Sequence, residues 1–322
     1  MVFAWFIQFA IQLPKAKKFG YDFKLNFDFK DENIKKVFKI AIPIILSTAV
    51  LPINTLISTR FASDFGDKGI ASLDYAYKLY IVISGVFTYA IGNIIFPELS
   101  RAISSKDTIE YKNIIERAIK LSSYILIPLT CGIIIFSKDI VSIFYERGEF
   151  TKETTISVAS CLVLYAIGIF GAGIVEIMNK SFYAKQDTKT PLKIGICIIL
   201  INIIFSAIFT KTFLKYTGLA LANSITALIN AAILIIISNI QNRIITKELV
   251  LYLLKILISS IVMCILVITL NIMFANIGLS NTIILNLINV FLCAIIGFSI
   301  YFGITYMLKS NLIIEEFKKM KK

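Results

Sequence analysis

The sequence predicts an all-α polytopic membrane protein with eight full transmembrane helices and a partial one at the N-terminus. Of the 322 residues, 57% are hydrophobic and 16% are charged, whereas soluble domains carry about 25% charged residues. Several charge-free runs approach or exceed the roughly 20 apolar residues that a spanning helix needs. The basic residues lie in short segments between these runs, so the net charge of +13 indicates membrane orientation and argues against nucleic-acid binding.

The N-terminal region divides into two segments. Residues 1–13 are apolar and uncharged but too short to span, which predicts the end of a truncated transmembrane helix. Residues 14–39 contain eight lysines with aromatic residues between them. This pattern predicts a cytoplasmic amphipathic basic linker on an anionic membrane surface.

Eight charge-free spans are expected after the linker. Residues 40–242 hold six of them, which predicts a six-helix lobe. The run of 53 residues from Ile256 to Leu308 must hold two more, because the turn formers of Asn276–Asn281 interrupt it. We therefore expect a final helix pair over 249–308 and a basic tail over 309–322. The six runs of the lobe are 40–59, 79–97, 121–137, 154–175, 194–210 and 216–242.

The loops between the spans alternate in charge. One side, which includes residues 14–39, 101–120, 180–193, 243–255 and 309–322, carries 25 of the 33 basic residues. Since basic loops stay inside, this side and the C-terminus are expected in the cytoplasm. Prolines add local detail: Pro52 and Pro128 should kink their helices and free carbonyl groups that a polar ligand could use, and for Pro128 an ordinary packing kink of a membrane bundle is the favoured alternative.

The reactive residues argue against catalysis. All five cysteines lie in apolar runs without CxxC spacing, and the chain has no histidine. The commonest general base and the commonest metal ligand are therefore absent from the sequence. We expect no metal site, no resident cofactor and no enzyme activity.

Lys78 is the most informative charge. It precedes the 79–97 run directly, and Asp74 lies four residues earlier. A lysine within a spanning helix is costly towards the bilayer centre. One interpretation is a lysine that reaches the membrane surface and pairs with Asp74. The other is a cationic group at the mouth of a cavity that receives an anionic ligand.

Four strings resemble one family of transporters: LDYAYKLY…GVFTYAIGNIIFPELSRA, FYERGEFT, FYAKQDTKTPLKI and GLALANSITALINA. In this order they resemble the MurJ (MviN) lipid II flippases of the multidrug/oligosaccharidyl-lipid/polysaccharide exporter superfamily. The resemblance implies a V-shaped transporter with two six-helix lobes around a cationic cavity and a final helix pair that forms a lipid-tail groove. It also implies that this chain lacks most of the first lobe, so a separate chain is a candidate partner that supplies it.

The resemblance suggests substrate-binding residues. Lys78 stands where the family has an essential arginine in its eighth helix. Lysine keeps the positive charge, but unlike the guanidinium group of arginine it cannot bind two phosphate oxygens side by side. Arg60 and Asp74 are expected near the mouth of the same cavity. The alternative for Arg60 is a charged helix end whose side chain reaches the membrane surface. Glu176 is a carboxylate within an apolar run, with Lys180 four residues later. This pair is either a gate or buried charge, or an ordinary stabilising helix pair.

The resemblance also suggests an ion site. Some members bind sodium between helices seven, eleven and twelve through Asp, Asn and Thr side chains. The corresponding candidates are Asn54, Asn202, Ser206 and Thr226, none of which is a carboxylate. Interhelical hydrogen bonding is the alternative role for these residues.

The function that these observations favour is flipping of lipid II, an anionic undecaprenyl-pyrophosphate-linked substrate, across the bacterial cytoplasmic membrane by alternating access. A polysaccharide-lipid flippase of the same superfamily is an alternative, as is a non-transporting remnant or partner subunit. A drug or cation antiporter is disfavoured because the 40–59 run has no carboxylate. A membrane-embedded transferase or hydrolase would need a catalytic cluster that the sequence does not show.

Overall fold

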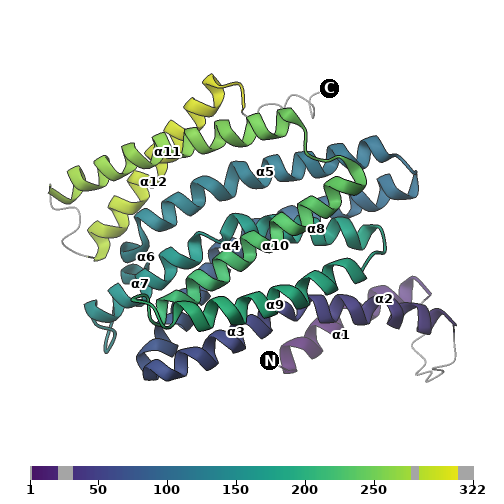
Figure 1. The fold of residues 1–322 in the computed structure, drawn as a ribbon, viewed down its shortest axis with the longest axis horizontal. Helices are drawn as coiled ribbons and strands as arrows, with labels where there is room; N and C mark the ends of the chain where they lie inside the picture. Colours follow the sequence, from purple (N-terminus) through teal and green to yellow (C-terminus); the bar gives the residue numbers. More distant parts are fainter. Residues whose placement is uncertain (1, 21–31, 277–282, 311–322) are drawn as a thin grey trace. The chain divides into compact units, whose positions relative to one another are not determined.

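The computed structural model describes residues 2–20, 32–276 and 283–310, and all regular elements in these ranges are helical (Figure 1). The chain divides into two compact units, Met1–Ile42 and Pro43–Lys322. The helices are α1 (Val2–Lys18), α2 (Glu32–Thr48), α3 (Val50–Ala62), the 3₁₀ turn η1 (Ser63–Phe65), α4 (Gly66–Ser104), α5 (Thr108–Ile135), α6 (Ser137–Tyr145), α7 (Lys152–Ala166), α8 (Ile169–Ala184), α9 (Lys189–Phe209), α10 (Thr217–Asn242), α11 (Lys247–Asn276) and α12 (Ile283–Met307).

The first unit contains α1 and the beginning of α2. Exposed aromatic side chains such as Trp5 and Phe6 lie along α1. The middle of the expected basic linker, residues 21–31, lies outside the described residues, and so do the end of the basic tail from residue 311 and the NIGLSN break from residue 277.

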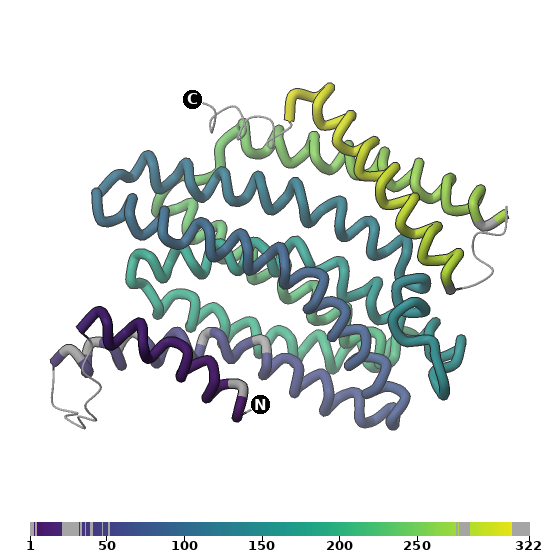
Figure 2. Tube along the Cα trace, turned by 180° about the vertical axis from the view of Figure 1, so that it is seen from behind, coloured from purple at the N-terminus to yellow at the C-terminus, as the bar shows by residue number. Residues whose placement is uncertain are grey.

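The second unit is built around α4, which packs against α5, α7 and α8. On one side α10 contacts α7, α8 and α9, while α3 packs against α9. On the other side α11 packs against α5, and α12 crosses α11 and also reaches α6 (Figures 1 and 2). Fully buried apolar side chains such as Leu99, Ile115 and Met178 fill the contacts between α4, α5 and α8.

Six helical segments of the described chain are long and apolar enough to cross a membrane, or seven if the bent pair α7–α8 is one span. The chain is thus an all-helical membrane protein, as expected. The two helices predicted within 256–308 are present as α11 and α12. The count of eight stays a prediction, because its first span corresponds to α2 and α3, which are separate helices on either side of Ala49.

The charge-free run over 154–175 is not one continuous helix but lies in two, α7 and α8. The helix breaks between Ala166 and Ile169, and α7 and α8 meet at an angle of 44°. The Ser224 hydroxyl of α10 donates to the carbonyl oxygens of Leu164 (2.5 Å) and Tyr165 (3.1 Å) at the end of α7. A side chain that satisfies backbone groups in this way permits a break within the bilayer.

Pro128 frees a carbonyl group, as its position predicts. Proline has no N–H to donate to the carbonyl four residues earlier, which belongs to Tyr124. In the structure the Tyr301 hydroxyl of α12 donates to the Tyr124 carbonyl oxygen at 2.9 Å. The freed carbonyl is therefore used in the packing between helices, by a tyrosine of the final helix pair.

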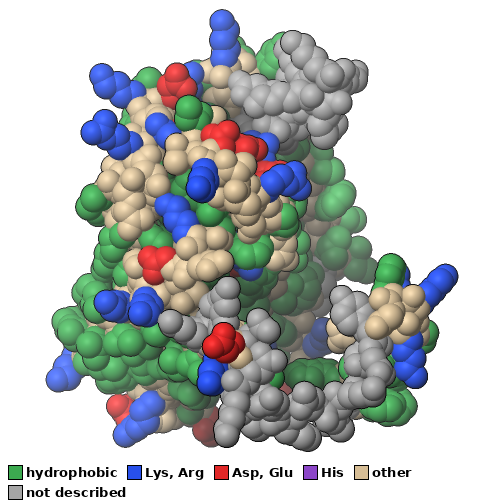
Figure 3. All heavy atoms as spheres, turned by 90° about the vertical axis from the view of Figure 1, so that its right-hand side faces the viewer, with side chains coloured by type: hydrophobic (Ala, Val, Ile, Leu, Met, Phe, Trp, Pro, Cys, Tyr) green, Lys and Arg blue, Asp and Glu red, His purple; other side chains and the backbone are tan. Residues whose placement is uncertain are grey.

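Loops that the charge pattern assigns to the same side of the membrane lie at the same end of the second unit. At one end, Lys185 after α8 donates to the Asn242 Oδ1 atom at the end of α10 and lies over the Tyr111 ring of α5. At the other end, Tyr75 of α4 packs on Tyr145 and Phe150. The charge alternation along the sequence thus corresponds to two ends of the second unit, and Lys and Arg side chains are prominent on the first of them (Figure 3).

Candidate functional site

Within the second unit, one face of α4 is not covered by other described helices. Residues such as Leu73, Ala76 and Leu79 are buried against the neighbouring helices. The opposite stripe, with Val82 and Tyr89 at 65% and 55% exposure, is open. Lys78 belongs to this open stripe, so we name it, with Asp74, Lys78, Val82 and Tyr89, the open face of α4.

Lys78 and Asp74 form an ion pair on this face. The distance from Lys78 Nζ to Asp74 Oδ2 is 2.6 Å, and the side chains are 60% and 53% exposed. The ammonium group also lies 5.6 Å from the centre of the Tyr75 ring. The i,i+4 spacing predicted this pair, and the pair keeps the positive charge accessible from the open side.

Arg60 occupies a different environment. It donates to the Ser63 Oγ atom at 3.0 Å and lies 3.4 Å from the Asp64 carboxylate, at the corner between α3 and α4. Its side chain is 78% exposed. Among the described residues no contact joins Arg60 to Lys78, so the structure does not bring these two candidates together.

Glu176 and Lys180 of α8 lie against the inner part of α4. Their charged atoms are 3.5 Å apart, and their side chains are only 22% and 27% exposed. Lys180 lies over the Phe96 ring of α4. A Cβ atom at Gly92 would be 3.0 Å from Glu176 Cγ, so the absence of a side chain at Gly92 makes room for the carboxylate.

Two of the four ion-site candidates, Asn202 and Thr226, belong to a chain of hydrogen bonds through α3, α9 and α10. Asn202 Nδ2 donates to the Thr226 hydroxyl (3.2 Å) and to Asn223 Oδ1 (3.3 Å). Asn223 Nδ2 then donates to the Ser58 hydroxyl at 2.9 Å. Sequence reasoning missed Asn223 and Ser58, although Asn223 lies in the GLALANSITALINA string and Ser58 is one turn from Asn54.

Three oxygen atoms in this region have no hydrogen-bond partner in the described part of the chain. They are Asn54 Oδ1, Asn202 Oδ1 and Ser206 Oγ, on side chains that are at least nine-tenths buried. Buried polar atoms are normally satisfied. Unpaired oxygens on the adjacent helices α3 and α9 are therefore the groups that a hard cation could use, since such cations prefer oxygen ligands.

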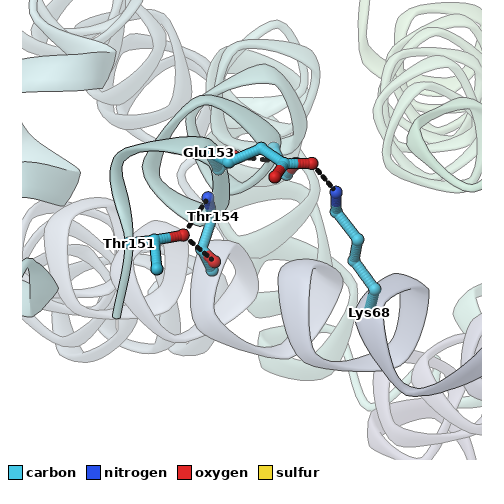
Figure 4. A network of polar contacts seen from close by, with 5 residues as sticks. Lys68, Thr151, Glu153 and Thr154 are labelled. Carbon is cyan, nitrogen blue, oxygen red and sulfur yellow. Dashed lines mark hydrogen bonds and ion pairs between the residues drawn. The ribbon is translucent and has the colours of Figure 1, made fainter. Parts of the chain in front are cut away.

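The first turns of α4 and α7 are joined by a further ion pair that the sequence did not indicate. Lys68 Nζ lies 2.5 Å from Glu153 Oε1 (Figure 4). Thr151 caps α7 beside it, since its hydroxyl accepts from the Thr154 N–H at 3.4 Å. The hydrogen bond from Lys68 lowers the pKa of Glu153, and the same bond raises the pKa of Lys68.

Comparisons of the sequence with a family model and with curated proteins all point to one family. The sequence model of the family described as "Lipid II flippase MurJ" matches residues 1–289. The probable lipid II flippase MurJ of Rickettsia prowazekii is 30% identical over 310 residues, which are 96% of this chain and 61% of that protein. The counterpart from Vibrio cholerae is 30% identical over 228 residues, 71% of this chain and 43% of that protein.

Solved structures of transporters are similar to this chain in fold. A structure described as lipid II flippase MurJ in an inward closed conformation matches with a TM-score of 0.70 and 25% identity, over 90% of this chain and 57% of that chain. An outward-facing multidrug transporter of the MATE family matches with a TM-score of 0.57 and 14% identity, over 85% of this chain and 65% of that chain. The second likeness concerns the fold alone. The chain spans less than two thirds of the length of each of these four proteins.

Proposed function

Because the chain belongs to the MurJ lipid II flippase family, we propose that it forms the substrate-moving second lobe and final helix pair of such a transporter. Its substrate is a lipid-linked precursor of the undecaprenyl-pyrophosphate type. Alternating access carries the headgroup across the bacterial cytoplasmic membrane, while the lipid tail stays among membrane lipids. The process moves a molecule without changing its covalent bonds, so the chain acts as a transporter and not as an enzyme.

The single observation that carries this proposal is Lys78 on the open face of α4. Its ammonium group is held by Asp74 at 2.6 Å, and the side chain as a whole is 60% exposed. A pyrophosphate oxygen that approaches this face can replace the Asp74 carboxylate as the hydrogen-bond acceptor. Lysine acts on phosphate as a point charge, so it can hold and release the headgroup without a bidentate geometry.

The open face also suggests what completes the transporter. The chain covers 61% of its Rickettsia relative and 57% of the solved flippase. We propose that a first lobe, in the same or a separate chain, lies opposite α4 and encloses the cavity. The end with the α4–α5, α8–α9 and α10–α11 corners faces the cytoplasm, together with the C-terminus, because its loops carry the excess of basic residues.

We also propose a sodium ion as the coupling ion of this lobe. The unpaired oxygens of Asn54, Asn202 and Ser206 would hold it, with the Thr226 hydroxyl beside them. An ion there would fix α3 against α9 and α10. This ion would supply energy for rearrangement of these helices and would take no part in bond chemistry.

The test uses the complete transporter that contains this chain, expressed in cells depleted of their own lipid II flippase. Lys78→Ala should abolish rescue of growth, and Lys78→Arg should retain it, because the charge on the open face is kept. Lys68→Ala is the matched control, since Lys68 is also an exposed lysine paired with a carboxylate but lies away from that face. Full growth with Lys78→Ala would remove Lys78 from the transport mechanism.

The same cells identify the substrate. External labelling of lipid II should fall with Lys78→Ala in proportion to growth. If labelling of lipid II is unchanged while export of another lipid-linked saccharide stops, the polysaccharide-lipid alternative is correct.

A further inference from the structure

A second basic site lies at the end of the second unit that we assign to the cytoplasm. A cavity of about 930 Å³ opens there between the first turns of α5, the end of α10 and the start of α11. Its lining combines Lys112, Arg243 and Lys247 with Glu116 and Glu248. None of these residues belongs to the open face of α4 or to the polar chain around Asn202.

The three basic side chains have no acidic partner among the described residues. Glu116 forms an ion pair with Lys120, whose Nζ atom lies 2.7 Å from Glu116 Oε1. Glu248 makes no ion pair in the described part of the chain. The lining thus sets three cations, Lys112, Arg243 and Lys247, against the one unpaired carboxylate of Glu248, which leaves an excess of positive charge. None of the three cations forms an ion pair within the described residues, in contrast to Lys78 and Lys180, which are each paired with a carboxylate.

The positive character comes from these side chains and not from helix ends. The N-terminus of α5 is capped by Asp107, which accepts from the N–H groups of Ile109 (3.0 Å) and Glu110 (2.8 Å). The N-terminus of α11 is capped by the Thr246 hydroxyl, which accepts from the Leu249 N–H at 3.1 Å. An anion would therefore bind in this cavity through Lys112, Arg243 and Lys247.

Two apolar side chains are part of the otherwise polar lining of the cavity. Ile109 and Ile240, both among the lining residues, are 72% and 77% exposed. Each lies about one turn from a cationic residue of the same segment, Lys112 or Arg243. A ligand that fills this site must offer a negative headgroup to the cations and hydrocarbon to the isoleucines. A phospholipid has this combination, whereas free phosphate has only the first part.

We propose that this cavity binds the headgroup of an anionic phospholipid from the cytoplasmic leaflet, with its acyl chains against Ile109 and Ile240. The bound lipid fastens α11 to α5 and α10, and so holds the final helix pair to the lobe. The inference rests on the proposed orientation, because only that places the cavity at the anionic leaflet. Basic pockets between helices on this side are recognised lipid sites in membrane proteins.

The test titrates the purified full chain with phosphatidylglycerol and with phosphatidylcholine, and counts bound lipids by native mass spectrometry. The variant combines Lys112→Gln, Arg243→Gln and Lys247→Gln. Each basic group near an anionic surface contributes about fivefold to binding, so phosphatidylglycerol affinity should fall about 100-fold. Binding of phosphatidylcholine should not change. The matched control, Lys138→Gln with Lys152→Gln and Lys211→Gln, removes the same charge at the opposite end and should bind as the wild type does.

Two further measurements complete the test. Lys112→Arg with Arg243→Lys and Lys247→Arg keeps the charge and should keep the lipid, which separates a charge effect from misfolding. Excess inorganic phosphate should not displace phosphatidylglycerol, because phosphate cannot contact the isoleucines. Equal lipid binding by the neutralised variant and its control would overturn the proposal, and so would displacement by phosphate. The readout is independent of transport, so failure of the Lys78 test would leave this result standing.

Discussion

Replacing Gly171 with alanine should weaken the contact between α8 and α10. A Cβ atom at this position would lie 2.9 Å from the Ala227 carbonyl carbon, 2.9 Å from the Leu228 nitrogen and 3.0 Å from the Ala227 oxygen. All three are main-chain atoms, so no side chain can rotate to make room. The two helices must instead move apart.

The size of the effect follows from these distances. Carbon atoms are in optimal contact at about 3.5–4.0 Å, so the helices must separate to relieve the overlap. A gap of about 0.5–1 Å between the other atoms of the two helices then removes a quarter to a half of the energy of each contact. Overpacking of this kind costs about 1–3 kcal/mol. One kcal/mol corresponds to about 2–4 °C in proteins somewhat smaller than this one, so the Tm in detergent should fall by about 2–12 °C.

The control is Gly132→Ala in α5. Apart from the nearby backbone of α5 itself, no described atom lies within 4 Å of its added Cβ, and alanine favours a helix by up to about 1 kcal/mol over glycine. Its Tm should therefore equal or exceed that of the wild type. The reasoning about the α8–α10 contact fails if Gly171→Ala melts at or above the wild-type temperature, or if both variants lose the same number of degrees.

Three further predictions concern single contacts. Tyr301→Phe removes the donor to the Tyr124 carbonyl and should cost about 0.6–1.7 kcal/mol in melting experiments, while Tyr306→Phe, at an exposed tyrosine, should cost nothing. Gly92→Ala crowds Glu176 at 3.0 Å and should lower the Tm more than Gly85→Ala, whose Cβ meets only the edge of the Tyr89 ring at 3.4 Å. The pKa of Glu153 is lowered from its ordinary value of 4.5 by Lys68, so this carboxylate stabilises the fold above that pH and the benefit is lost as the pH falls through the lowered pKa. The Tm difference between wild type and Glu153→Gln should accordingly be present at neutral pH, shrink in acid and also shrink in high salt; a difference that grows in acid would contradict the ion-pair explanation.

Local patterns predicted the features that depend on neighbours in the sequence. The pairs Asp74–Lys78 and Glu176–Lys180 follow from i,i+4 spacing, and both are present. The carbonyl group freed by Pro128 follows from the chemistry of proline. The two helices within 256–308 follow from length alone, since 53 apolar residues cannot form one span.

Features that depend on which helices meet could not be predicted in this way. The break between α7 and α8 depends on Ser224, a residue of another helix that satisfies the exposed carbonyl groups. The place of Glu176 depends on Gly92 of α4. In the same way, Asn223 and Ser58 join the polar chain around Asn202 only because α3, α9 and α10 come together.

The distribution of paired and unpaired charges connects the two proposed sites. On the open face of α4, Lys78 is already bonded to Asp74, so an arriving phosphate exchanges one charge-assisted hydrogen bond for another. Such an exchange gives little net affinity, which suits a surface that a substrate must leave. The cavity beside α11 has the opposite character, because its lining keeps an excess of positive charge from Lys112, Arg243 and Lys247, none of which is ion-paired within the described residues, and it therefore suits a lipid that stays bound. If this reasoning is correct, Asp74→Asn should tighten substrate binding at Lys78 and slow its release, whereas a variant of the cavity should change neither step.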